Sequence, residues 1–303
     1  MRKFITHTFV TSTRLVFKNL KLVLLLFVVN FSFALALTLP IFSLLRDNLL
    51  HSSLNAHFTG EFDYVWFLQF ISLNKQTVTG IPGLLYIITI IYNLIQLFFS
   101  GGLMTIFNNP QKNHVVDFFF GGVKYFFRFF QLFCVALIFY FLLITFNAFL
   151  DSVIVKTMAY SQNMRLEFFI QLFRYLIFIL LIGVINIIFD YSRVITVVND
   201  KSKVLKVIGQ SFVFIKNNFS LVASVYFITG SCVIVATIIY NVFDSYIPKT
   251  SLALLIVTFF IQQLLIIFRL TIKMLFSATE IVVYNDLNAE IIDTNVEEIS
   301  TGI

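Results

Sequence analysis

Long apolar runs recur six times along the chain, separated by shorter polar connections. A helix needs about 20 predominantly apolar residues to cross a hydrocarbon layer of about 30 Å. No water reaches the backbone there, so each crossing segment must close its own hydrogen bonds, which favours helices. The pattern predicts an all-α integral membrane protein with six transmembrane helices, at residues 21–45, 83–107, 129–150, 168–188, 220–243 and 251–274.

The first apolar run is expected to remain in the protein as a membrane span. It is longer than the roughly 7–15 residues of a signal-peptide core, and no small-x-small cleavage pattern follows it. The segment of residues 46–82 is the only sizeable connection on the outer side. Its aromatic residues Tyr64, Trp66 and Phe67 suit the membrane–water boundary, which predicts one or two short helices lying on the outer surface.

The composition agrees with a bilayer as the surrounding solvent. Charged residues make up 12% of the chain, about half of the roughly 25% found in soluble domains. Mean hydropathy is +0.94. These values exclude a water-soluble enzyme, a disordered chain and a disulfide-rich secreted module. Cys134 and Cys232 both lie inside apolar runs, so we expect two small buried hydrophobic residues and no disulfide or metal site.

The distribution of Lys and Arg predicts an orientation. Alternate connections, counted with the N-terminal segment, carry 13 of these residues against 5 on the other side. Basic residues collect on the cytoplasmic side, so both termini are expected in the cytoplasm. The net charge of +6 is assigned to basic helices that face anionic lipid headgroups, and no nucleic acid is expected as a partner.

Self-comparison of the chain indicates a threefold repeat. Even-numbered spans end in GGLMTIFNN, YSRVITVVND and SATEIVVYND, and the odd-numbered spans begin after the similar stretches RLVFKNLKL, KYFFRFFQL and SFVFIKNNFSL. The interpretation is three two-span repeats, each preceded by a cytoplasmic interfacial helix. A codon bias that enriches Phe, Ile and Asn could also produce this likeness. The repeats would cover residues 1–109, 110–200 and 201–286, followed by an acidic, disordered cytoplasmic tail at residues 287–303.

The sixth predicted span carries the strongest polar pattern. At about 100° per residue, Gln262, Arg269, Lys273 and Glu280 fall within about 20° of one line. One interpretation is a polar seam that faces the interior of the bundle and lines a path for an anionic ligand. In the alternative, Arg269 and Lys273 reach the inner headgroups and Glu280 lies in water. Gln262 requires a partner within the protein in either case.

Other polar residues within the predicted spans have simpler interpretations. Arg174, in the fourth span, is expected to pair with Asp151, with Glu167 or with outer headgroups, and a role in a ligand or ion path is the alternative. The remaining expectations are interhelical hydrogen bonding by Asn93, Gln96 and Ser100, a local ion pair between Asp190 and Arg193, and close helix approach or bends at Gly101-Gly102 and Gly121-Gly122.

Catalytic and metal-binding patterns are nearly absent from the sequence. His51 and His57 are six residues apart, which places them on different faces of a helix, so an outer metal site formed with Glu61 and Asp63 is not favoured. There is no HExxH, GxSxG or Walker A motif and no Cys-His pairing. We therefore expect no enzymatic activity, no cofactor and no metal.

Three stretches resemble a known group of proteins. They are DYSRVITVVNDKSKVLKVIGQSFVFIKNNF from Asp190, GGLMTIF followed by VVDFFFGGVKYFFRFFQLF, and FIQQLLIIFRLTIKMLFSATEIVVY. They are similar to uncharacterised multi-span bacterial inner-membrane proteins, which are loosely grouped with the membrane domain attached to glycerophosphodiester phosphodiesterases. The catalytic domain of those phosphodiesterases is missing here. The resemblance therefore implies a bacterial inner-membrane helical bundle and no catalytic residue.

These observations favour a non-enzymatic inner-membrane protein that acts as a structural or accessory component of the cell envelope. The alternative is a small permease or channel that uses the interface between repeats and the polar residues Gln262, Arg269, Lys273 and Arg174. A membrane enzyme is the third possibility.

Overall fold

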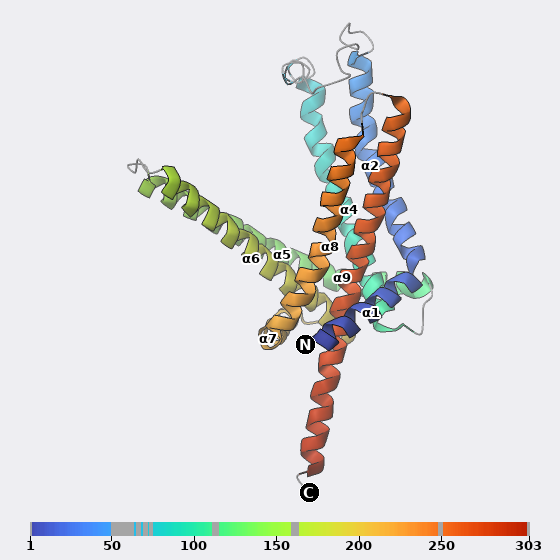
Figure 1. Ribbon diagram of the computed structural model, residues 1–303, viewed down its shortest axis with the longest axis vertical. Coiled ribbons are helices and arrows are strands. Elements are labelled where there is room, and N and C mark those ends of the chain that lie inside the picture. The colour runs from blue at the N-terminus through green and yellow to red at the C-terminus, as the bar shows by residue number, and fades with distance from the viewer. Residues whose placement is uncertain are drawn as a thin grey trace. The chain divides into compact units, whose positions relative to one another are not determined.

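The computed structural model describes residues 2–49, 64, 68, 72, 75–110, 115–158, 164–247 and 251–301, and these are helical apart from short connections. Within this part of the chain there is no strand. The helices are shown in Figure 1: α1 (Arg2–Lys18), α2 (Leu20–Leu49), α4 (Lys75–Asn108), α5 (Val115–Met158), α6 (Met164–Val198), α7 (Val204–Asn217), α8 (Phe219–Tyr246) and α9 (Leu252–Thr301).

The predicted spans are confirmed as helices. Among the described residues, six helical segments are long and apolar enough to cross a membrane: Leu20–Ser43, Gly83–Asn108, Val115–Met158, Met164–Val198, Phe219–Tyr246 and Ala253–Asn288. Only 11–22% of the most apolar window in each segment is buried within the protein. Large apolar side chains such as Phe141, Phe173 and Phe260 are exposed along these helices. Such a surface suits hydrocarbon, and the chain is a multi-pass membrane protein.

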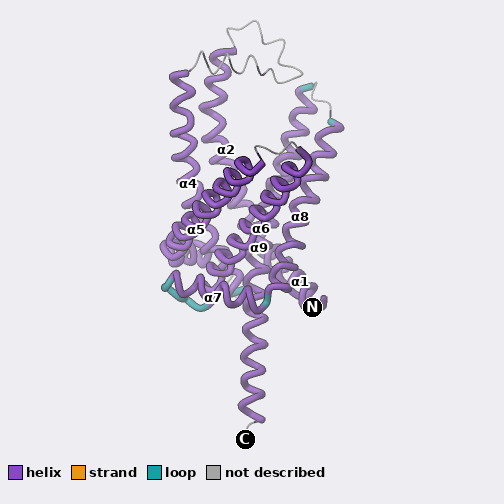
Figure 2. Tube along the Cα trace, turned by 90° about the vertical axis from the view of Figure 1, so that its left-hand side faces the viewer, coloured by secondary structure: helices purple, strands orange, loops and turns teal. Residues whose placement is uncertain are grey.

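The chain forms two compact units. The first contains Met1–Ser12, Leu97–Val225 and Ser277–Ile303, and the second contains Thr13–Gln96 and Tyr226–Phe276. In the first unit, α5 and α6 run side by side as a long hairpin, and α7 packs against both (Figures 1 and 2). The buried core of this unit is rich in large side chains, including Leu103, Phe118, Phe129 and Tyr191.

Pairs of glycines bring α4 and α5 into close contact, as the sequence predicts. A methyl group added at Gly102 would lie 2.5 Å from the Phe118 carbonyl oxygen, and one at Gly101 would lie 3.1 Å from the Gly121 carbonyl oxygen. A methyl group at Gly122 would lie 2.7 Å from the Phe98 ring. Residues without a side chain are therefore needed on both helices at this crossing.

Separate helices precede two of the three odd-numbered spans. The chain breaks between α1 and α2 at Asn19, whose side-chain amide donates to the Leu15 carbonyl at 2.9 Å. It breaks again between α7 and α8 at Asn218, whose amide donates to the Phe214 carbonyl at 3.1 Å. In the alignment of RLVFKNLKL with KYFFRFFQL, Phe129 replaces Asn19, and it is fully buried. Accordingly, α5 continues unbroken from Val115 to Met158.

α9 continues as a helix to Thr301, beyond the predicted span that ends at residue 274. Glu and Ala are good helix formers, and the preceding turns supply the helical nucleus. Both cysteines are free, but Cys134 is exposed and Cys232 is partly exposed, so the prediction that both are buried was wrong. An apolar run does not distinguish a face that contacts lipid from one that contacts protein.

Several predicted features lie outside the described residues. These are most of the outer segment at residues 46–82, with Trp66 and Phe67, and the histidines His51 and His57. Tyr64 is described as helical and exposed.

Candidate functional site

Polar contacts connect three helices of the second unit. The Tyr92 hydroxyl on α4 donates to the Asn30 amide oxygen on α2 at 2.5 Å, and the Tyr92 ring also stacks edge-on against Phe33. One turn further along α4, the Gln96 amide oxygen accepts a hydrogen bond from the Lys273 ammonium on α9. Arg269 lies close enough to the Tyr92 hydroxyl to interact with it electrostatically. Lys273 and Arg269 therefore belong to a cluster that joins α2, α4 and α9.

The structure divides the predicted polar stripe of α9. Gln262, Arg269 and Lys273, in the second unit, all have exposed side chains. Glu280, in the first unit, is buried, so the interpretation that places it in water is wrong. The sequence missed Gln263, which is partly buried and whose amide oxygen is enclosed without a hydrogen-bond partner.

Arg174 lies in a polar group on the α5–α6 hairpin of the first unit. Its guanidinium donates to the Asp151 carboxylate at 2.9 Å and to the Asn147 carbonyl at 3.2 Å, and it lies 4.5 Å from the centre of the Tyr175 ring. Gln171 donates to the same carboxylate at 3.2 Å. Of the partners predicted from the sequence, the structure selects Asp151. The Arg174 side chain is only 6% exposed, whereas that of Asp151 is 46% exposed.

Two further contacts lie nearer the other end of the same hairpin. The Tyr140 hydroxyl on α5 donates to the Asn186 amide oxygen on α6. The predicted ion pair between Asp190 and Arg193 is confirmed, with 2.9 Å between the two charged groups. The apolar pattern alone does not indicate the Tyr140 contact, because a tyrosine within an apolar run is also compatible with simple packing.

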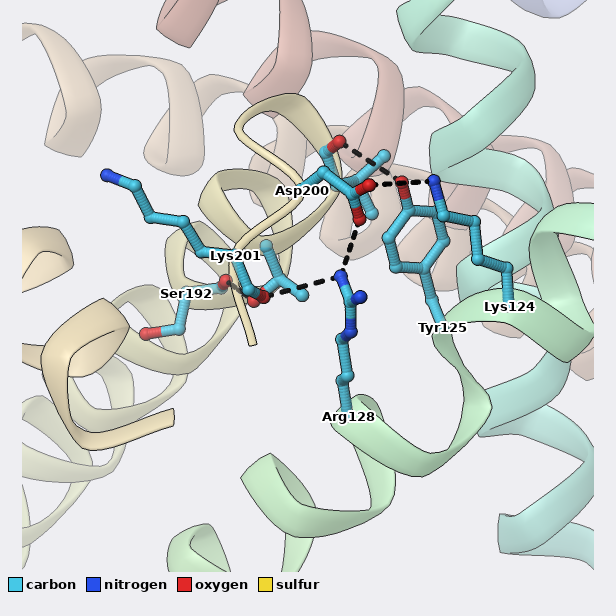
Figure 3. Close-up of polar contacts among 8 residues, drawn as sticks. Lys124, Tyr125, Arg128, Ser192, Asp200 and Lys201 are labelled. Carbon is cyan, nitrogen blue, oxygen red and sulfur yellow. Dashed lines mark hydrogen bonds and ion pairs between the residues drawn. The ribbon is translucent and has the colours of Figure 1, made fainter. Parts of the chain in front are cut away.

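Asp200 forms an ionic contact that fixes the end of α6 to α5, as Figure 3 shows. The Lys124 ammonium and the Arg128 guanidinium, one turn apart on α5, lie 3.0 Å and 2.6 Å from its two carboxylate oxygens. Asp200 has φ of 47°, which places it in the left-handed region where short polar residues are tolerated. The Lys201 ammonium next to it donates to Gln210 on α7 at 3.0 Å.

The charges around Asp200 make this contact sensitive to acid. The Arg128 guanidinium, followed by the Lys124 ammonium, lowers the pKa of the Asp200 carboxyl below its ordinary value. A lowered pKa stabilises the folded state at pH above the ordinary value of about 3.9, and this contribution is lost as pH falls through the lowered pKa. The contribution is small because the carboxylate is 53% exposed. This ionic contact was not identified from the sequence.

The ends of the three even-numbered spans are joined by hydrogen bonds from asparagine side chains. The proposed repeat aligns Asn108, Asn199 and Asn285. The Asn285 amide donates to the Asn108 amide oxygen at 3.4 Å, and the Asn199 amide donates to the hydroxyl of Tyr284 at 2.8 Å. The first of these pairs is separated by 177 positions, the same separation as between Gln96 and Lys273.

Across the described ranges, no cluster of three or more His, Cys, Asp or Glu side chains has a geometry that could hold a metal ion. No family model, curated protein or solved structure matches the chain.

Proposed function

We propose that the chain is a non-enzymatic membrane protein that acts as a structural or accessory component of a cell envelope. One observation supports this: polar side chains in the spans are used to join neighbouring helices. The pairs are Tyr92–Asn30, Lys273–Gln96, Tyr140–Asn186, Arg174–Asp151 and Asn285–Asn108. Interhelical hydrogen bonds of this kind hold membrane bundles together.

A bacterial inner membrane and cytoplasmic termini are part of the proposal. They rest on the 13 to 5 distribution of Lys and Arg and on the resemblance to bacterial inner-membrane proteins. We expect a membrane-impermeant amine reagent to label Lys18 and Lys203 from the same, cytoplasmic side. Labelling of the two lysines from opposite sides would refute the orientation.

The three-repeat organisation is also proposed. The contacts between residues separated by 177 positions support it, as do the chain breaks at Asn19 and Asn218. A chance likeness produced by codon bias would not be expected to bring corresponding residues into contact.

A small permease or channel for anions is the second candidate function. It is favoured by the exposed side chains of Gln262, Arg269 and Lys273 on one stripe of α9. Cations within a span attract anionic solutes and are costly to maintain unless they have a use.

Flux measurements in proteoliposomes separate the two functions. If the protein is an accessory component, the passage of chloride, phosphate and glutamate should equal that of protein-free liposomes. A flux that exceeds this background in the wild type and is lost in the double variant Gln262→Leu/Arg269→Leu would show that the protein transports the anion, and the accessory function would be rejected. Thr271→Val is a matched control on the same helix, because its hydroxyl donates to the Ile267 carbonyl one turn earlier in that helix. A folded double variant, eluting as a single species in detergent, is required for either conclusion.

A further inference from the structure

An apolar groove runs between α8 and α9 in the second unit. It has a volume of about 780 Å³, and its walls include Phe227, Val235 and Phe243 on α8 and Ile261, Leu265 and Phe268 on α9. Ser231 also lies in the wall, but its hydroxyl donates to the Phe227 carbonyl at 2.7 Å within α8. The groove therefore offers contacts suited to a hydrocarbon chain, and its surface is poorly suited to a polar solute.

The dimensions of the groove suit a lipid chain. Sixteen helical steps separate Phe227 from Phe243, about 24 Å along α8. One leaflet of the hydrocarbon layer is about 15 Å deep, half of the full thickness. The groove is therefore longer than one leaflet is deep, so an acyl chain can contact it along the chain's whole length.

Two cations follow the α9 wall of the groove along the chain. Arg269 follows the groove residue Phe268 directly and lies one turn from Leu265, and Lys273 is one turn further along. Both cationic side chains are exposed, although Lys273 also donates to Gln96 and Arg269 interacts with Tyr92 on α4. Arg269 is 17 steps from Leu252, the start of α9, or about 26 Å, which is close to the thickness of the hydrocarbon layer. If α9 enters the bilayer near Leu252, Arg269 reaches the headgroup level of the far leaflet.

We propose that this groove binds one acyl chain of an anionic phospholipid whose phosphate group contacts Arg269, with Lys273 beside it. A guanidinium presents paired N–H donors that match two phosphate oxygens, and the surrounding low dielectric strengthens the contact. The lipid's net negative charge compensates a cation at the edge of the hydrocarbon. A membrane lipid is the expected occupant because its headgroup can contact the cation while its acyl chain fills the apolar groove. A free anion could contact only the cation.

Fluorescence quenching by brominated lipids tests this site in the full-length protein. Trp66→Phe removes the single native tryptophan, and Phe268→Trp places a reporter in the groove. The protein is reconstituted in phosphatidylcholine vesicles containing increasing fractions of chain-brominated phosphatidylglycerol or chain-brominated phosphatidylcholine. We expect the anionic lipid to be preferred at the reporter by about fivefold for each cation it contacts.

Three variants define what the result means. Arg269→Gln should remove most of the preference, and Arg269→Gln/Lys273→Gln should abolish it, whereas Thr271→Val should retain it. A reporter at Leu142→Trp, on an exposed face of α5 outside this groove, should show no preference. Equal quenching by the two lipids at the groove, or a preference that survives the double substitution, would overturn the proposal. Val235→Trp, on the α8 wall, serves as the reporter if Phe268→Trp does not fold.

Discussion

Replacing Gly102 with valine is expected to prevent α4 and α5 from packing and to give a protein that aggregates or unfolds at markedly lower temperature. The new Cβ atom would lie 2.5 Å from the Phe118 carbonyl oxygen and 2.6 Å from its ring. The ring can rotate, but the carbonyl oxygen belongs to a helix and can move only if the two helices separate. Overpacking typically costs about 1–3 kcal/mol, and a backbone clash belongs at or above the upper end of this range.

Gly183→Val is the matched control for this prediction. Gly183 also lies within a span, but a Cβ atom there would meet no atom within 4 Å outside its own helix. Thermal unfolding in detergent and the elution profile on size exclusion should separate the two variants. Similar midpoints for Gly102→Val and Gly183→Val would show that the close approach of α4 and α5 contributes little to stability.

Asp151→Leu is expected to destabilise the α5–α6 hairpin more than the double variant Asp151→Leu/Arg174→Leu. The single substitution leaves the buried Arg174 guanidinium without its carboxylate, and loss of one partner of a buried ion pair costs about 3–5 kcal/mol. The loss here should be smaller, because Asp151 is half-exposed in the structure. Leucine at both positions removes the charge from an apolar environment and should recover much of the stability.

A double-mutant cycle measures this coupling. It compares the midpoints of thermal unfolding of the wild type, Asp151→Leu, Arg174→Leu and the double variant. Glu167→Gln is the control, because Glu167 is the alternative partner suggested by the sequence and the structure pairs Arg174 with Asp151. If the double variant is less stable than Asp151→Leu alone, Arg174 stabilises the hairpin through contacts other than the ion pair.

The spans were predictable from the sequence because the constraint that produces them is local. A run of about 20 apolar residues is sufficient to cross the hydrocarbon layer, and nothing distant in the chain needs to be known. Close contact at the glycine pairs was one of the two outcomes that the sequence suggested, the other being bends in the helices.

The partners of polar side chains were harder to predict. Arg174 had two nearby carboxylates to choose between, and Lys124 and Arg128 are more than 70 positions from Asp200. A single sequence gives no information about such distances. The sequence did contain one indication of this contact. Asp200 is the last residue of a proposed repeat, and the two cations lie near the start of the same repeat.

The sequence was least informative about which face of each transmembrane helix is buried against the protein. Gln262, Arg269 and Lys273 form a polar stripe in the sequence, yet they are exposed, while Glu280 on the same stripe is enclosed by protein. In water, a polar stripe indicates the outer face of a helix, but in a bilayer both lipid and protein neighbours are apolar, so periodicity loses this meaning.

The unbroken course of α5 has a mechanical consequence. α1 and α2, like α7 and α8, meet at an asparagine where the ladder of backbone hydrogen bonds is interrupted, so each pair can bend there at modest cost. α5 has no such joint over its 44 residues, about 66 Å. A displacement of its first turns would therefore be transmitted along the whole helix. In the other two pairs, a displacement of α1 or α7 would be taken up by bending at the asparagine.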